Sequence, residues 1–290
     1  MKTLVGCATD TAEMMIEAIV NVGILGCGAM GRELALATDS DRIPNARVVA
    51  LFDIDEKAVA GLSADLSNPP TGYSDIDTFV AHPGLGLVVE CASQAAARAH
   101  AAKILRTGAA LILMSSGALT DPDVYEEMSD AARSSGGKVI VPSGAIGGID
   151  AIRAVKHLLE TVTLTTTKPP LALSGAPGFA EWEDREITEA TVIFDGPASE
   201  AVRLFPANVN VGATLSLAGI GPTQTMVTVI ADPDAPGNVH QIEASGSFGK
   251  FKFEFINEPH PANPKTSYLA PLAAIEALRT YCDTGPRIGS

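Results

Sequence analysis

The first half of the chain alternates short apolar runs with amphipathic segments. The apolar runs predict strands at Val22–Leu25, Arg47–Asp53, Leu87–Cys91, Ala110–Met114 and Lys138–Val141. The segments between them have the apolar spacing of helices, at Ala29–Ala37, Glu56–Ala64, Gln94–Arg106 and Asp121–Ser134. Near-continuous apolar strands that alternate with helices are typical of a parallel sheet covered on both faces. Residues 21–148 are therefore predicted to form a doubly wound α/β domain.

The pattern changes after Gly148, where longer strands with β-branched or alternating content follow one another. We expect strands at Val162–Thr167, Glu189–Asp195, Gln224–Ala231, Val239–Phe248 and Lys250–Asn257, and helices at Ile149–Glu160, Pro197–Leu204, Val209–Ala218 and Thr266–Thr280. Clustered strands with few helices indicate a C-terminal α+β domain with an open sheet over residues 149–265. Residues 266–290 carry a final helix, and the pattern leaves open whether it packs back on the first domain. Leu171–Glu183 is the most loop-like region.

Composition narrows the class of protein. The 290 residues are 46% hydrophobic and 19% charged, which excludes general disorder, and the formal charge is −14. Such an acidic chain is not expected to bind nucleic acid or an anionic membrane. The longest uncharged stretch, Leu204–Ala231, is broken by Pro, Asn and Gly and does not predict a membrane helix. Four cysteines without a close pair favour a cytoplasmic protein. Residues 1–20 are interpreted as an N-terminal extension, with Met15 as an alternative start.

A glycine-rich turn follows the first predicted strand. The segment Gly26-Cys27-Gly28-Ala29-Met30-Gly31 matches G-x-G-x-x-G and opens a helical pattern. In this context Gly26 permits the tight turn, Gly28 lets the backbone approach a pyrophosphate, and Gly31 allows close helix–strand packing. The helix N-terminus supplies amide donors to phosphates, and the backbone amides of Ala29 and Met30 are among these donors. An ordinary strand–helix turn is the alternative. We favour a Rossmann-type dinucleotide-binding domain.

Asp53 ends the second predicted strand and bears on which dinucleotide binds. A carboxylate at this place accepts hydrogen bonds from the adenosine ribose and repels a 2′-phosphate, so NAD is favoured over NADP. The alternative role is to cap the next helix. Ser115 follows a strand end and is expected to line the cofactor pocket.

Several later segments are too specific to be expected of every Rossmann-type protein. They are Ser143–Asp150, Thr166–Pro170, Phe205–Val211, Asn238–His240 and Asn263–Ser267. Together with the fingerprint, they closely resemble the L-aspartate dehydrogenase family over about Val22 to Arg279. The resemblance implies NAD(P)-dependent oxidation of L-aspartate to iminoaspartate, which hydrolyses to oxaloacetate and ammonia, and a link to NAD biosynthesis. It also implies a homo-oligomer, with a dimer favoured. It places the catalytic histidine at His240 and nicotinamide-side contacts at Ala145 and Asn210, although Asn208 is an alternative to Asn210.

The residue chemistry fits a base at His240. Oxidation of an amine by hydride transfer requires a neutral amine, and histidine can accept its proton and later activate water. His100 and His157 fall in amphipathic helices, and His82 and His260 stand next to prolines in expected loops. A hydrogen-bonded structural histidine is the alternative for His240.

A dicarboxylate substrate requires cations in this acidic chain. Lys168 is the first candidate and Lys265 the second, with Thr266 and Ser267 as hydroxyl donors; either lysine could instead lie at the surface. Arg203 is interpreted as solvated or as a subunit contact. Cys27 and Cys91 are expected to be packing residues. No metal-ligand pattern is present, so no metal site is expected.

Two other functions remain open at this point. One is an NAD-dependent dehydrogenase of another small amino acid, hydroxy acid or semialdehyde, because fold does not fix the substrate. The other is a dinucleotide sensor without turnover. Retention of His240 and of two candidate carboxylate-binding lysines argues against the sensor.

Overall fold

The first domain is built on a six-stranded parallel sheet. The computed structural model describes residues 19–286, so the predicted N-terminal extension lies almost wholly outside the described residues. The strand order is β3-β2-β1-β4-β5-β6, that of a dinucleotide-binding doubly wound sheet. The strands are β1 (Val20–Leu25), β2 (Ala46–Phe52), β3 (Thr71–Tyr73), β4 (Leu87–Glu90), β5 (Ala110–Leu113) and β6 (Val139–Ile140). The predicted Rossmann-type domain is confirmed.

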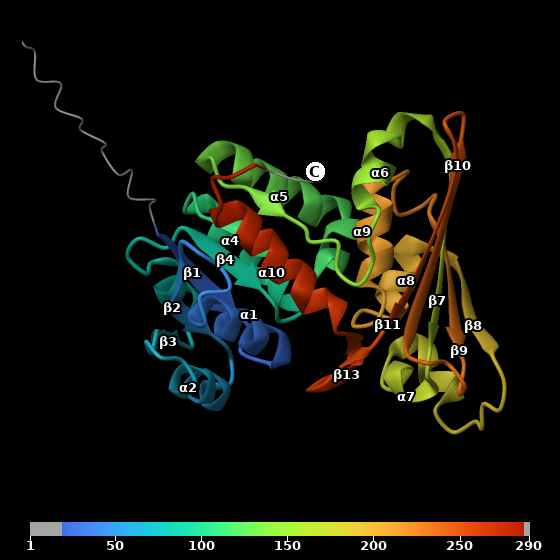
Figure 1. Ribbon diagram of the computed structural model, residues 1–290, viewed down its shortest axis with the longest axis horizontal. Coiled ribbons are helices and arrows are strands. Elements are labelled where there is room, and N and C mark those ends of the chain that lie inside the picture. The colour runs from blue at the N-terminus through green and yellow to red at the C-terminus, as the bar shows by residue number, and fades with distance from the viewer. Residues whose placement is uncertain (1–18, 287–290) are drawn as a thin grey trace, which may run out of the picture.

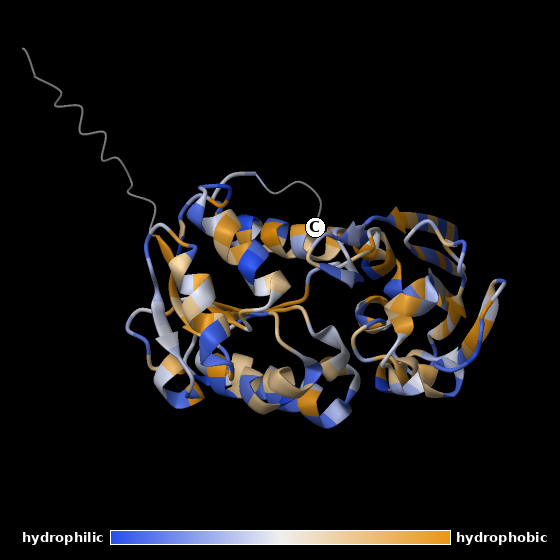
Figure 2. Cartoon of the chain, turned by 90° about the horizontal axis from the view of Figure 1, so that it is seen from below, coloured by the Kyte–Doolittle hydropathy of each residue, from blue (hydrophilic) through white to orange (hydrophobic). Residues whose placement is uncertain are grey.

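Helices cover both faces of this sheet because its central strands are apolar on both sides. The helices are α1 (Ala29–Asp39), α2 (Glu56–Ala64), α3 (Ile76–Val80), α4 (Gln94–Arg106), the short 3₁₀ helix η1 (Ser116–Thr120) and α5 (Pro122–Ser135). One core layer joins α1 and α2 to the sheet, and a second joins α3, α4 and α5 to its other face. Figure 2 shows the apolar strands in the middle, between helices with hydrophilic outer surfaces.

The second domain lies beside the first and contains a mixed five-stranded sheet (Figure 1). Its order is β11-β10-β7-β9-β8, in which only β7 and β9 are parallel. The strands are β7 (Leu159–Lys168), β8 (Thr191–Pro197), β9 (Met226–Ala231), β10 (Asn238–Gly246) and β11 (Gly249–Asn257). Its helices are α6 (Ile149–Ala154), η2 (Lys156–Leu158), α7 (Pro170–Leu173), η3 (Pro177–Trp182), α8 (Ala198–Leu204) and α9 (Asn210–Ala218). The predicted α+β domain with an open sheet is confirmed.

The C-terminal segment returns to the first domain. Strands β12 (Pro259–His260) and β13 (Asn263–Ser267) form a small hairpin, and α10 (Leu269–Cys282) follows. Residues Ala274, Ile275 and Leu278 of α10 are buried in the same core layer as α1. The helix therefore crosses from the second domain onto the first, as the red ribbon in Figure 1 shows.

Four details differ from the sequence expectations. The helix expected from Thr266 starts at Leu269, because 263–267 is a strand paired with β12. The helix expected over Ile149–Glu160 ends at Ala154, and β7 takes up the β-branched residues that follow. The expected loop Leu171–Glu183 contains the short helices α7 and η3. The pattern did not predict β3 and α3, because elements this short carry little periodicity.

No helix within residues 19–286 combines the length and the apolar character that a membrane span requires.

Candidate active site between the domains

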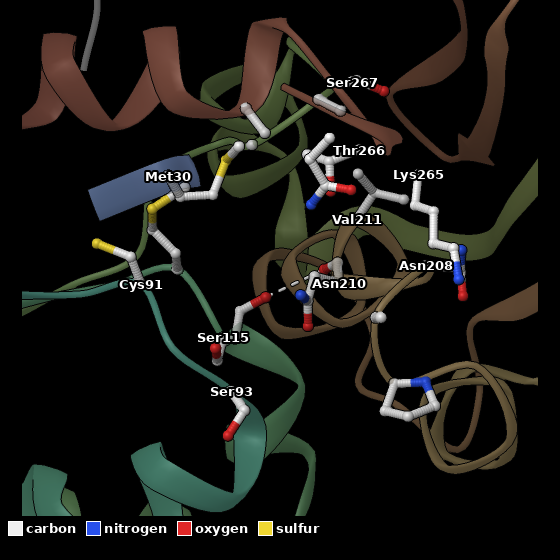
Figure 3. Close-up of a pocket in the computed structure, with 18 of the residues that line it drawn as sticks. Met30, Cys91, Ser93, Ser115, Asn208, Asn210, Val211, Lys265, Thr266 and Ser267 are labelled. Carbon is white, nitrogen blue, oxygen red and sulfur yellow. Dashed lines mark hydrogen bonds between the residues drawn. The ribbon is translucent and has the colours of Figure 1, made fainter. Parts of the chain in front are cut away.

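A cavity of about 490 Å³ lies between the two domains. Figure 3 shows residues converging on it from three parts of the chain: Met30, Cys91, Ser93 and Ser115 from the first domain, Asn208, Asn210 and Val211 from the second, and Lys265, Thr266 and Ser267 from β13. Among the described residues, its lining includes two lysines and no aspartate or glutamate. Within the described residues, the cavity wall therefore carries lysine side chains and no carboxylate.

The glycine-rich turn forms one end of the cavity. Gly26 has φ +99°, which favours glycine, and a Cβ at Gly31 would collide with the carbonyl oxygen of Gly26. A Cβ at Gly28 would meet nothing within 4 Å, so this position is open toward the cavity. No side chain caps the N-terminus of α1. The turn thus presents free backbone amides where a pyrophosphate would fit.

Asp53 lies beside this turn and not on the cavity wall. Its Oδ2 accepts a hydrogen bond from the Cys27 amide at 2.7 Å, and its Oδ1 accepts one from the Asp55 amide at 3.0 Å. Asp55, and not Asp53, caps α2 by accepting from the Lys57 amide. The alternative role of Asp53 as a helix cap is therefore wrong, and its carboxylate holds the glycine-rich turn instead.

A buried glutamate organises the strand ends under the cavity. Glu90, 1% exposed, accepts hydrogen bonds at Oε1 from the amides of Ala92 and Ser93 and from Ser115 Oγ, all within 3.0 Å. Its Oε2 accepts from the Ser115 amide at 2.9 Å. Burial raises the pKa of Glu90, and these four hydrogen bonds oppose that rise. The sequence places Glu90 at a strand end beside the expected cofactor pocket, but its pattern does not predict these hydrogen bonds.

Asn210 connects the two domains. Its Oδ1 accepts hydrogen bonds from the Gly117 amide at 3.2 Å and from Gln94 Nε2 at 3.4 Å, and its carbonyl oxygen accepts from Ser116 Oγ. Its Nδ2 is left to face the cavity, which Asn210 lines. The contacts of Gln94 and Ser116 with Asn210 could not be predicted from the sequence, because no motif relates residues that meet only when the domains dock.

Ala145 and Asn208 line the same cavity from the second domain. Ala145 is buried, and its carbonyl oxygen accepts a hydrogen bond from Asn257 Nδ2 at 2.9 Å. Asn208 donates through Nδ2 to the Ala172 carbonyl at 2.7 Å. Asn208 therefore supports α7, whereas the Nδ2 of Asn210 stays available to a ligand.

His240 reaches the cavity from β10. It is 1% exposed, and its Nδ1 lies 3.1 Å from Thr166 Oγ1 on the neighbouring strand β7. Burial, and to a smaller extent the nearby charge of Lys168, lowers the pKa of His240 to about 3. The imidazole is therefore neutral at physiological pH and can accept a proton.

Lys168 is the buried cation of the site. It is 3% exposed, and its Nζ donates to the Lys265 carbonyl at 3.4 Å. Burial lowers the pKa of Lys168 to about 8. Lys265 is exposed, and its Nζ donates to the Ser174 carbonyl. Thr266 and Ser267 line the cavity between these lysines and α10.

The remaining histidines lie outside the cavity lining. His260 is buried in the short strand β12, where a loop was expected. Its Nδ1 accepts a hydrogen bond from the Ala262 amide, and its ring packs edge-on against Tyr268. His82 bonds to the Tyr73 hydroxyl. His100 packs against Phe52. These contacts are structural.

Cys27 and Cys91 are not activated thiols. Burial raises the pKa of Cys27 to about 12 and raises that of Cys91 as well. Arg203 is exposed beside Glu200 and does not line the cavity.

Comparison with known proteins agrees with the fold. The sequence profile "Aspartate dehydrogenase, C-terminal" matches residues 150–281, and "Homoserine dehydrogenase, NAD binding domain" matches residues 26–142. The chain is 44% identical over 272 residues to the L-aspartate dehydrogenase of Nitrosopumilus maritimus, covering 93% of this chain and 99% of that protein. It is 40% identical over 266 residues to that of Pseudomonas aeruginosa, covering 91% and 98%.

The chain belongs to the aspartate dehydrogenase family. The resemblance of the five sequence segments to this family is thus confirmed. A solved structure of aspartate dehydrogenase from Thermotoga maritima superposes with a TM-score of 0.73 at 26% identity, covering 92% of this chain and 99% of that chain. A myo-inositol dehydrogenase from Lactobacillus casei shares the fold alone, at 17% identity and a TM-score of 0.56.

Proposed function

We propose that this protein is an NAD-dependent L-aspartate dehydrogenase that oxidises L-aspartate to iminoaspartate, which hydrolyses to oxaloacetate and ammonia. The observation that carries the proposal is the charge of the cavity. In a chain of formal charge −14, the described residues that line it include Lys168 and Lys265 beside a neutral histidine, and no carboxylate. Such a lining favours an amino acid that carries a second carboxylate.

The residues present fit a dinucleotide. The open position at Gly28 and the uncapped N-terminus of α1 provide amides for a pyrophosphate, Asp53 lies beside the turn for the ribose, and Asn210 Nδ2 faces the cavity for the nicotinamide carboxamide. Ala29, Met30, Ser115 and Ala145 complete this half of the cavity. When bound, the cofactor accepts a hydride from C2 of the substrate.

Lys168 and Lys265, with the hydroxyls of Thr266 and Ser267, bind and orient the substrate carboxylates. His240 takes a proton from the substrate ammonium group, because an amine must be neutral before its carbon gives up a hydride. The negative charge of the substrate offsets Lys168 and stabilises the protonated imidazole. His240 passes this proton to solvent before the hydrolysis. Water then adds to the C=N carbon of iminoaspartate, and His240 accepts a proton from that water and returns it to the leaving nitrogen. Loss of ammonia leaves oxaloacetate.

The test is an assay of the purified full-length protein with L-aspartate and either NAD or NADP, followed at the absorbance of the reduced nicotinamide. We expect reduction with aspartate and a preference for NAD. A panel of other amino acids, hydroxy acids and semialdehydes serves as the comparison. Strong activity on one of these without activity on aspartate would contradict the proposal, and NADH binding without turnover of any substrate would indicate a sensor.

We propose further that the protein forms a homodimer through the uncovered face of the five-stranded sheet. The helices of this domain pack on the opposite face, and the uncovered face exposes Val192 (55%), Met226 (42%) and Ile256 (63%). Exposed apolar residues on one sheet face are typical of a protein interface. Size-exclusion chromatography with light scattering of wild type and Ile256→Lys tests this, with dissociation expected in the variant. A cytoplasmic location and a link to NAD biosynthesis stay predictions.

A further inference from the structure

Asn238 is a buried polar residue that no part of the proposed mechanism uses. Its side chain is 1% exposed, and neither Oδ1 nor Nδ2 has a hydrogen-bond partner. Three other buried polar side chains of this region are paired: Thr166 with His240, Asn208 with Ala172 and Asn257 with Ala145. His260 has one unpartnered ring nitrogen, Nε2, whereas both polar atoms of Asn238 are unpartnered. A buried amide without partners destabilises the fold, so its presence here calls for a ligand or a neighbour that it serves.

The pairing of β10 with β7 places Asn238 beside Lys168. His240 is paired with Thr166, and Val239 with Thr167. When this register is continued by one residue on each strand, Asn238 lies opposite Lys168. Side chains alternate along each strand, and Asn238, His240, Thr166 and Lys168 are all on the buried face. Asn238 and Lys168 are therefore neighbours on the sheet in the same way as His240 and Thr166.

Lys168 has unused donors on this face. Its ammonium group has three N–H donors, and the structure shows one acceptor, the Lys265 carbonyl at 3.4 Å. The other charged or titratable side chains on the cavity walls around it are His240 from β10 and Lys265 from β13. In the structure Asn238 lies behind the cavity wall, which it does not line, and its Oδ1 makes no hydrogen bond to Lys168. A neutral carboxamide oxygen that reaches the ammonium group would orient it without cancelling its charge.

We propose that Asn238 positions the Lys168 ammonium and that the pair forms the site for the carboxylate by which a dicarboxylic amino acid differs from a monocarboxylic one. This inference rests on the proposed function and deepens it, because it names the residue that gives the cavity its selectivity. Asn238 acts through Lys168 and is a positioning residue. Asparagine suits this place because an aspartate would neutralise the lysine that must bind the substrate.

The test uses full-length Asn238→Asp, with Asn68→Asp as control, since Asn68 is exposed between α2 and β3 and undergoes the same change of charge. Inhibition by succinate and by butyrate against aspartate compares a dicarboxylate with a monocarboxylate of the same length. In Asn238→Asp we expect the Ki of succinate and the KM of aspartate to rise about 10- to 100-fold, with butyrate little changed. The Kd for NADH and the behaviour of Asn68→Asp should match wild type.

A second variant and a pH profile separate positioning from a structural role. Asn238→Ala should also weaken succinate without affecting NADH. In Asn238→Asp the new carboxylate should raise the pKa of Lys168, so the loss of aspartate binding at alkaline pH should move to higher pH. The inference would be overturned if both variants kept the wild-type ratio of the Ki values for succinate and butyrate. It would also be overturned if NADH affinity and melting temperature fell together while the pH profile stayed unchanged. An inactive wild type would instead contradict the proposed function.

Discussion

The imidazole Nδ1 of His240 lies 3.1 Å from Thr166 Oγ1, and both side chains are buried. This bond fixes the ring so that Nε2 is the nitrogen available to the cavity. Removal of the substrate ammonium proton at Nε2 requires the tautomer whose proton is on Nδ1, with Thr166 as acceptor. The pair therefore fixes the orientation of the base, and the threonine hydroxyl can accept the Nδ1 proton of the tautomer that the reaction needs.

Replacing Thr166 by valine should lower kcat without a matching change in KM. The substitution keeps the shape but leaves Nδ1–H unpaired, and a lost hydrogen bond of this kind predicts a decrease of about 10- to 100-fold. Steady-state kinetics with aspartate measures it. Thr163→Val, the same change on the exposed face of β7, is the control. Normal turnover by Thr166→Val would show that the threonine does not set the tautomer.

Aspartate capture should weaken above about pH 8, where the buried Lys168 loses its proton. The charged form, present below this pKa, binds the carboxylate. Because kcat/KM reports groups of the free enzyme, a plot of log kcat/KM against pH should lose one unit of slope near pH 8. The Kd for NADH, measured over the same range, is expected to stay constant. A kcat/KM that keeps its slope up to pH 10 would contradict this role of Lys168.

Lys168→Met should stabilise the fold while it abolishes aspartate binding. Burial of the charged lysine lowers its pKa from 10.5 to about 8, so folding at pH 7 is opposed by about 3 kcal/mol that a methionine would not incur. Between these pKa values the unfolded state binds more protons, so wild-type stability rises with pH and the advantage of the variant shrinks. Urea unfolding at pH 7 and pH 10 measures both effects. If the variant were less stable at pH 7, the contacts of the ammonium group would stabilise the fold by more than the loss of its hydration destabilises it.

Local sequence was sufficient to predict the Rossmann half of the site. The turn at Gly26–Gly31 has its own backbone requirement, and the apolar strands carry a strong periodic signal. His240 was predicted from the resemblance to a family, and Lys168 from the need of a dicarboxylate substrate for a cation in an acidic chain. Three features depend on strand register and domain docking instead. They are the contact of Thr166 with His240, the hydrogen bonds that Glu90 accepts at the strand ends, and the unpaired side chain of Asn238. Contacts of that kind join residues far apart in the chain, so pattern alone does not show them.

Glu90→Gln should weaken cofactor binding. The carboxylate of Glu90 accepts four hydrogen bonds, and glutamine would present an NH₂ group to at least one donor. We expect a loss of about 1–3 kcal/mol in unfolding free energy and a Kd for NADH raised about tenfold, because Ser93 and Ser115 on the cavity wall lose their anchor. Glu126→Gln, exposed on α5, is the matched control. Fluorescence titration with NADH that gives equal Kd values for Glu90→Gln and wild type would refute this role.

Asp53→Ser should shift cofactor preference toward NADP. The carboxylate that now holds the Cys27 amide would also repel a 2′-phosphate, so its loss should raise the ratio of kcat/KM for NADP to that for NAD at least about tenfold. Part of the change should come from weaker NAD binding, since the shorter serine cannot make both amide contacts of Asp53. Asp55→Ser is the control, because serine can still cap α2 and the formal charge changes equally. If both variants changed the NADP-to-NAD ratio alike, the cause would be the overall charge of the loop. If Asp53→Ser left this ratio unchanged, Asp53 would only hold the turn, and other residues would determine cofactor preference.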